Sequence, residues 1–246
     1  MKKTFTWALT AIAVMTVLTG CEKEDEDAIS MDVVNKGITT KPGKDGKQYA
    51  VVDLGVDVLW ATCNIGAASP EQYGYYFAWG ETQSKEEYYW STYSHCDGEP
   101  SAIKKYVFDE NLGTVDHKNT LEPVDDAAKQ LMGDSWSIPS RAMYQELLYR
   151  CNYKCCKLND TWGYLFTSKE NGNSIFFPLS GMRDPKDIFF SSERGYYWSN
   201  ELYTGDKDNK KTHNAFTLDL LKEKEPISSS FQSREIGLPI RPVYIE

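Results

Sequence analysis

Among the residues that could take part in chemistry, Cys21 has the most informative sequence context. It follows a short basic start and an apolar segment, residues 4–18, and it precedes a run of charged residues at 22–27. Its thiol is a nucleophile that can accept a lipid group. A basic start followed by a short apolar segment is the layout of a secretory signal peptide, and a membrane-spanning helix needs about 20 apolar residues. We therefore expect residues 1–20 to be a signal peptide.

Residues 18–21, Leu-Thr-Gly-Cys, resemble the bacterial lipobox, which is the cleavage motif of lipoproteins. The resemblance implies that Cys21 is the first residue of the mature protein and carries acyl chains such as palmitate. Stable anchoring takes more than one acyl chain, so a Cys21 with several chains would be held firmly in a membrane. The alternative is an ordinary signal peptide followed by a cysteine without a lipid.

The charged run after Cys21 cannot enter a bilayer, and its like charges repel one another. We expect residues 21–47 to form the lipidated cysteine and a flexible acidic tether, because residues 28–47 are polar and contain two pairs of turn residues. The run also resembles the acid-rich export signal of surface lipoproteins of the Bacteroidota. That resemblance implies an outer-membrane protein that faces the cell exterior; a spacer facing the periplasm is the alternative.

Five further cysteines follow, and an exported chain can form disulfides: Cys63, Cys96, Cys151, Cys155 and Cys156. Since five is odd, we expect at most two disulfide bonds, with the connectivity open. A zinc site needs pairs of ligands at set spacing. Cys151 and Cys155 have no matching second pair, and the three histidines are scattered, so the sequence predicts no metal bound through cysteine or histidine, and no cofactor.

Patterns of known catalytic sites are missing from the sequence, including GxSxG, the P-loop and GxGxxG. Asp125 and Asp126 could be paired carboxylates for acid–base chemistry, but the positive end of a helix explains them better. Calcium bound by loop carboxylates such as Asp184 and Asp187 stays open. We therefore expect a protein that is not an enzyme.

Aromatic residues are the remaining candidates for ligand binding, since their flat rings can stack on the apolar face of a sugar. Tyr88, Tyr89, Trp90 and Tyr93 lie in a polar stretch, where stacking and burial in the core are both open. Four tryptophans in more apolar surroundings are expected in the core: Trp60, Trp79, Trp136 and Trp198.

Composition limits the class of protein. The formal net charge is −9, and no basic cluster occurs, which argues against nucleic-acid binding. Hydrophobic residues make up 41% of the chain, enough for a core, and the aromatic content of 13% favours a β-rich exported fold. Residues 48–246 have the length of one domain.

The order of expected elements gives the fold class. Strands are expected at 49–54, 58–63 and 75–79, before a long irregular stretch at 80–123. One short helix is expected at 125–132, where Gly133 ends it, and a second begins after Ser140. Met143 stands where a capping box has Glu or Gln, so only half of the reciprocal cap is expected.

The second half of the chain adds a predicted hairpin, residues 162–167 and 174–178, around Asn171-Gly172 with a type I′ turn. Further strands are expected at 196–199, 213–220 and 238–243. Two helices in the middle of many short strands indicate an α+β fold with antiparallel sheets.

Several of these pieces, in this order, resemble one family, the Fibrobacter succinogenes major paralogous domain (FISUMP) of Bacteroidota lipoproteins. The pieces are Val52-Asp53-Leu54-Gly55, Trp60-Ala61-Thr62-Cys63-Asn64, Tyr76-Phe77-Ala78-Trp79-Gly80-Glu81-Thr82, Asp125-Asp126-Ala127-Ala128, Trp136-Ser137-Ile138-Pro139-Ser140, Gly195-Tyr196-Tyr197-Trp198-Ser199 and Ile240-Arg241-Pro242-Val243. The resemblance implies a C-type-lectin-like domain at 48–246, with twisted antiparallel sheets, two central helices and long loops. It supplies no catalytic residues, and Met143 and the adjacent Cys155 and Cys156 depart from the family pattern.

The sequence thus predicts a surface-exposed outer-membrane lipoprotein that is a binding or adhesion module for glycan or protein ligands. The expected binding loops are residues 80–123, 181–194 and 202–211. The main alternative is a structural subunit of a fimbria or another cell-surface assembly. An enzyme is the third hypothesis, which a deep pocket lined by perturbed carboxylates or a Cys-His pair would favour.

Overall fold

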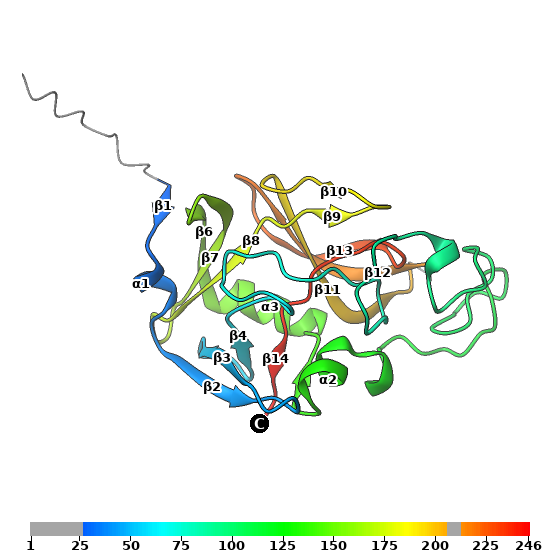
Figure 1. Cartoon of the computed structure of the whole chain (residues 1–246), viewed down its shortest axis with the longest axis horizontal. Helices are drawn as coiled ribbons and strands as arrows, with labels where there is room; N and C mark the ends of the chain where they lie inside the picture. The colour runs from blue at the N-terminus through cyan, green and yellow to red at the C-terminus, as the bar shows by residue number, and fades with distance from the viewer. Residues whose placement is uncertain (1–26, 206–212) are drawn as a thin grey trace, which may run out of the picture.

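The structure is a computed structural model that describes residues 27–205 and 213–246. The predicted signal peptide, Cys21 and the charged run up to residue 26 lie outside the described residues, as does part of the predicted loop at 202–211. The molecule is elongated, with β1 and α1 at one end and a long loop region at the other (Figure 1).

The described chain forms four sheets. The first has the order β1 (Ala28–Ile29), β6 (Cys151–Leu158), β7 (Thr161–Ser168) and β8 (Ser174–Pro178). The second has the order β2 (Ile38–Pro42), β3 (Gln48–Asp53), β4 (Leu59–Ala61), β14 (Val243–Tyr244) and β5 (Trp136–Ser137). The third contains β11 (Arg194–Tyr203), β12 (Asn214–Leu221) and β13 (Ile227–Ser233), and the fourth is the small hairpin of β9 (Met182–Arg183) and β10 (Ile188–Phe189).

Helices are few. They are α1 (Met31–Val34), α2 (Ala127–Met132), α3 (Arg141–Arg150) and the 3₁₀ helices η1 (Trp90–Thr92) and η2 (Pro123–Asp125). The chain is therefore largely β-sheet with a small helical part, consistent with the predicted α+β class. Across residues 27–205 and 213–246, no helix combines the length and the apolar character needed to cross a bilayer.

The N-terminal segment is part of the fold, so the prediction of a flexible tether over residues 28–47 is wrong. β1 pairs with β6 in parallel, and β2 pairs with β3 in the antiparallel direction. Val34 is buried, and Ile29 and Met31 pack beside it against the sheet of β6–β8. The segment is polar on average, but its three apolar side chains cover one face of the sheet. Its turn residues form the tip of the β2–β3 hairpin, where Gly43 N donates to Lys47 O.

Several other predictions can be compared with the structure. The β7–β8 hairpin is confirmed, but Gly172 is the only residue of its connection with positive φ, so the type I′ turn is wrong. The strand expected at 75–79 is reduced to a single bridge between Phe77 and Leu238. β6 was missed, because Cys151 looked like the last apolar residue of a helix, whereas it ends α3 and begins β6.

Both larger helices begin with side-chain caps. Asp126 accepts hydrogen bonds from the backbone of Ala128 and Lys129 at the start of α2. At α3, Ser140 Oγ accepts from Met143 N at 3.2 Å, and Met143 Sδ accepts from Ser140 N at 3.4 Å. The prediction of half a cap is therefore wrong, because the thioether takes the place of the missing carboxylate as a weaker acceptor.

The four tryptophans expected in the core are all fully buried there. Trp60 packs with Tyr144 and Phe177 in a cluster between the sheet of β6–β8 and the rest of the molecule. Trp79, Trp136 and Trp198 belong to a second cluster under α2. These four tryptophans are therefore packing residues of the core.

The C-terminal segment, residues 234–244, joins these clusters. Leu238 pairs with Phe77, and the carbonyl oxygen of Ile240 accepts from Ile65 N at 3.0 Å. Val243 pairs with β4 on one side and with β5 on the other. The last residues of the chain therefore connect segments that are far apart in sequence, and Figure 1 shows this segment, in red, running through β14 to the edge of the molecule.

Arg241 in this segment is fully buried. Its Nε donates to Asn64 Oδ1 at 2.8 Å, its Nη1 donates to Thr62 O at 2.7 Å, and its guanidinium lies 4.5 Å from the ring centre of Phe177. Burial lowers the pKa of Arg241. Carbonyl dipoles and an aromatic face therefore replace water around this group, and they fix the loop after β4.

We expect Arg241→Met to lower the free energy of unfolding by on the order of 3 kcal/mol, because it leaves buried oxygens of Thr62 and Asn64 without donors. Urea denaturation measures the change. Arg150→Met, at the exposed end of α3, is the matched control and should stay within about 0.5 kcal/mol of the wild type. Equal midpoints for the two variants would contradict this role.

Asp219 in β12 gives a pH-dependent prediction. Burial raises the pKa of this carboxyl from 3.8 to about 6, although Thr217 Oγ1 donates to it. Its contribution to stability is complete below pH 4 and is lost as the pH rises through 6, by on the order of 3 kcal/mol. Asp219→Asn should therefore remove this fall, measured by urea denaturation at pH 4, 5, 6 and 7. A difference in the free energy of unfolding between Asp219→Asn and the wild type that is the same at all four pH values would contradict this role of Asp219.

Candidate functional site

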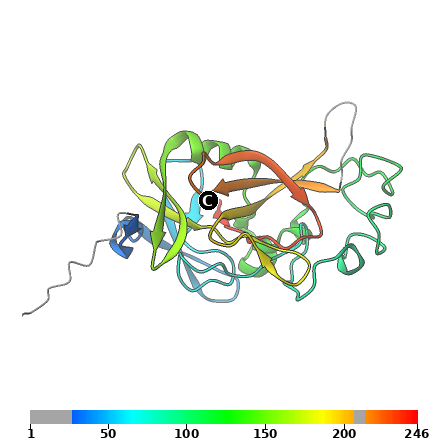
Figure 2. The same cartoon turned by 90° about the horizontal axis from the view of Figure 1, so that it is seen from above.

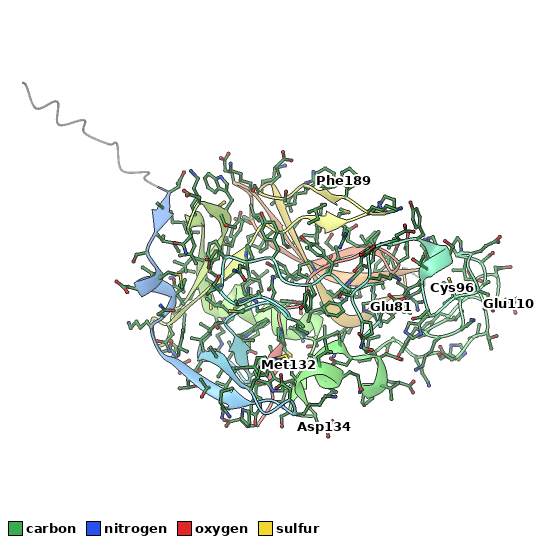
Figure 3. All side chains as sticks on the ribbon, viewed as in Figure 1. Glu81, Cys96, Glu110, Met132, Asp134 and Phe189 are labelled. Carbon is green, nitrogen blue, oxygen red and sulfur yellow. The ribbon has the colours of Figure 1, made fainter. Side chains whose placement is uncertain are left out.

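The stretch between Gly80 and Pro123 forms the end of the molecule farthest from β1 and α1 (Figures 1 and 2). It contains the 3₁₀ helix η1 and otherwise isolated bridges and turns. Figure 3 places Cys96 and Glu110 at this end. A stretch of this length without regular structure needs other groups to hold it in place, and buried side chains supply them.

The guanidinium of Arg234 is the main support of this loop. Arg234 is fully buried, 5.0 Å from the ring centre of Trp79 and 5.4 Å from that of Tyr93. Its Nε donates to Tyr93 OH at 3.0 Å, and its Nη2 donates to Lys105 O at 2.9 Å. Two separate parts of the loop are thus tied to one residue of the C-terminal segment.

Two of the four aromatic candidates are structural. Tyr88 is 1% exposed and Tyr93 is 2% exposed, and their hydroxyls donate to Tyr76 O and Trp79 O. A buried ring cannot stack on a sugar, so the prediction that these two bind a ligand is wrong. Tyr89 is 40% exposed and Trp90 is half-buried, so both remain at the surface.

The other two candidates, Asp184 and Asp187, lie at the exposed tip of the β9–β10 hairpin, where Asp184 N donates to Asp187 O at 3.0 Å. Within the described ranges, no group of three or more His, Cys, Asp or Glu residues could hold a metal ion. The hairpin instead presents three consecutive exposed apolar side chains, Ile188, Phe189 and Phe190, and Figure 3 shows Phe189 at the edge of the molecule.

This hairpin and the long loop touch each other. Tyr88 N donates to Pro185 O at 2.8 Å, and Lys186 Nζ lies 2.5 Å from Glu87 Oε1. We define the distal surface as four exposed residues and the half-buried Trp90 of these two segments: Tyr89, Trp90, Ile188, Phe189 and Phe190. The structure thus brings together two of the three loops that the sequence proposed for binding.

A polar cleft of about 400 Å³ lies beside the long loop and is lined in part by Glu81, Lys85, His95 and Asp125. His95 Nε2 is 2.9 Å from Gly80 O, so it carries the proton and donates, because a carbonyl oxygen only accepts. Burial lowers the pKa of His95, which favours the neutral ring. Its Nε2 is 3.9 Å from Asp125 Oδ1, which is too long for a hydrogen bond.

Asp125 is engaged with other donors. Its Oδ2 accepts from Lys105 Nζ at 2.5 Å and from Tyr106 OH. Glu81 likewise accepts from Ser94 N at 2.7 Å and pairs with Lys85 at 2.7 Å. The carboxylates of Asp125 and Glu81 are therefore occupied by hydrogen bonds and ion pairs that hold the long loop in place.

The five cysteines from Cys63 onward are free thiols, where we expected at most two disulfide bonds. Burial raises the pKa of Cys151 and that of Cys156 to about 11. Both thiols are therefore protonated at neutral pH, and a protonated thiol is a poor nucleophile.

The sequence did not reveal the network of Lys105, Tyr106 and Asp125. The pair at 125–126 was interpreted as a helix start, which is correct for Asp126 and wrong for Asp125. The partners of Asp125 lie about 20 positions earlier in a stretch without periodicity. No local sequence pattern predicts contacts between such residues, so the network is visible only in the structure.

No protein-family model matches the chain, and searches of curated proteins and of solved structures returned no significant match. Function is therefore inferred from the geometry and chemistry of the described residues.

We expect Arg234→Met to loosen the long loop selectively. Amide exchange at Tyr106 and Val107, whose backbones donate to Asp116, should become at least about tenfold faster, while β7 keeps its protection. Hydrogen–deuterium exchange with mass spectrometry resolves the two regions. Arg183→Met on the half-buried part of the β9–β10 hairpin is the control. Unchanged exchange in the loop of the Arg234 variant would show that the guanidinium is not its support.

Proposed function

We propose that this protein is a surface-exposed outer-membrane lipoprotein whose single C-type-lectin-like domain is a non-enzymatic binding or adhesion module. The observation that carries the proposal is the position of the long loop, which holds Tyr89 and Trp90 and forms the end of the molecule opposite the first described residues (Figures 1 and 2). The β9–β10 hairpin, which carries the rest of the distal surface, contacts this loop. Its ligand is a protein or a glycan on another surface.

The N-terminal end of the domain sets its orientation in this proposal. Asp27 O accepts from Lys157 N at 2.8 Å, and β1 continues as an edge strand beside β6. Cys21 stands six positions before Asp27, and six residues span at most about 20 Å. Acyl chains on Cys21 would therefore hold the β1 end close to the membrane and direct the end formed by the long loop away from it.

The chemistry of the distal surface supports ligand binding. The hairpin exposes two neighbouring aromatic rings, since the ring centres of Phe189 and Phe190 are 6.4 Å apart. The ion pair of Lys186 and Glu87 joins this hairpin to the long loop. Arg194 lies 5.0 Å from the ring centre of Phe190. Apolar anchors beside charged groups are typical of protein interfaces, where aromatic residues and Arg contribute most of the affinity.

The C-type-lectin-like assignment is part of the same proposal. It is supported by the FISUMP-like motifs, by the two helices α2 and α3 among mainly antiparallel sheets, and by the long loop at one end. Such a fold supports recognition by loops while its core stays constant.

A structural subunit of a surface assembly is the second candidate. It is favoured by β13, which forms one edge of the third sheet and exposes Ile227 and Phe231. An edge strand can pair with a strand of another subunit. Cross-linking on intact cells distinguishes the candidates, because an assembly subunit would yield a stoichiometric ladder or partner that does not depend on the distal surface.

The distal surface is tested by Phe189→Ser combined with Phe190→Ser. We expect binding of the purified whole protein to glycan arrays, or to collagen, laminin and fibronectin, to fall at least about tenfold, because aromatic anchors dominate interface energies. Val33→Ser, an exposed apolar residue at the β1 end, is the matched control and should bind like the wild type. Equal binding by all three proteins would contradict the proposed surface, as would no binding by the wild type.

A further inference from the structure

A second cleft, of about 580 Å³, lies away from the distal surface. It is formed by the β2–β3 turn, by β3 and β4, by the loop at 62–68 and by the end of α2, which Figure 3 marks at Met132. Pockets that hold small ligands commonly measure about 300–1,000 Å³. Neither the polar cleft nor the distal surface shares residues with it.

One wall of this cleft is the ring of Tyr75, which keeps 55% of its surface exposed. A Cβ built on Gly66 would lie 2.4, 2.5 and 2.7 Å from three adjacent ring atoms, so the ring packs face-on against the glycine backbone. Gly66 also has φ +83, a conformation that favours glycine. One face of the ring is thereby fixed, and the exposure of the residue leaves the other face free.

The backbone around Tyr75 is held by hydrogen bonds. Tyr75 N donates to Ile65 O at 2.8 Å, and Asn64 Nδ2 donates to Tyr73 O at 2.9 Å. Asn64 is itself held by Arg241 Nε. The aromatic wall is therefore rigid before any ligand arrives, and a preorganised wall loses less entropy on binding.

The rim of the cleft carries one charge of each sign. Lys47 Nζ lies 3.0 Å from Asp45 Oδ2, and Tyr49 OH donates to the same carboxylate at 2.8 Å. The hydrogen bond from Lys47 lowers the pKa of Asp45 to about 2, so the carboxylate is ionised at neutral pH. The lining between rim and wall is mostly apolar and includes Ala61 and Met132.

These features select for one class of ligand. A charged ligand would have to compete with the Asp45–Lys47 pair, and a purely apolar ligand would leave the polar rim without partners. A sugar ring has one apolar face for the ring of Tyr75 and hydroxyls for the carboxylate and ammonium of the rim. We propose that this cleft binds a neutral saccharide, with a pyranose ring stacked on Tyr75 and its hydroxyls bonded to Asp45 and Lys47.

This saccharide site does not depend on the proposed distal surface. The test uses the purified whole protein and oligosaccharides of glucose, galactose, mannose and N-acetylglucosamine, with sialylated and sulfated glycans for comparison. We expect a neutral oligosaccharide to bind, Tyr75→Ala to weaken it at least about tenfold, and Tyr75→Phe to keep it, because the ring face carries the contact. Tyr149→Ala, at an exposed tyrosine of α3, is the matched control.

Two further measurements test whether the saccharide binds in this cleft. Asp45→Ala removes the rim acceptor without touching the wall and should also weaken binding. Cys63 lines the cleft and is half-buried, so bound saccharide should slow its alkylation but leave that of the half-buried Cys155 unchanged. No binding of neutral oligosaccharides, binding of charged glycans only, or unchanged affinity of Tyr75→Ala would overturn the assignment, whatever the Phe189 and Phe190 variants show.

Discussion

Two buried guanidinium groups, Arg234 and Arg241, determine how the loops of this molecule are held. Both belong to the C-terminal segment, and both are removed from water, which is costly for a charge unless carbonyls and aromatic rings replace the solvent. Arg234 binds the long loop through Tyr93 and Lys105, and Arg241 binds the loop after β4 through Asn64. The distal surface and the second cleft therefore depend on the same short stretch of chain.

This arrangement separates support from recognition. The buried aromatic and arginine side chains leave little freedom to the loops, while exposed residues such as Tyr75, Tyr89 and Phe189 contribute little to the core and can change without unfolding the domain. The N-terminal segment adds a further constraint, since its pairing with β6 places the start of the domain at one end. This geometry supports the proposal of a surface module that is anchored at its β1 end.

The features predictable from the sequence are those fixed by neighbours in the chain. The caps at Asp126 and Ser140, the β7–β8 hairpin and the buried tryptophans all follow from local patterns. Tyr93 is held by Arg234, 141 positions later, and Tyr88 packs against Gly237. Residues 28–47 fold because β6 and β3 offer them edges. Partners at such distances leave no periodicity, so the aromatic candidates could not be divided into buried and exposed before the structure was known.

The orientation of the anchored domain is the central claim, and its most direct test is fluorescence quenching in lipid vesicles. A fluorophore is introduced at residue 33 or at residue 110, and the vesicles carry a quencher on their headgroups. Residue 33 lies beside β1, and Figure 3 shows Glu110 at the opposite end. The account predicts strong quenching at residue 33 and almost none at residue 110. Equal quenching at both positions, or stronger quenching at residue 110, would contradict it.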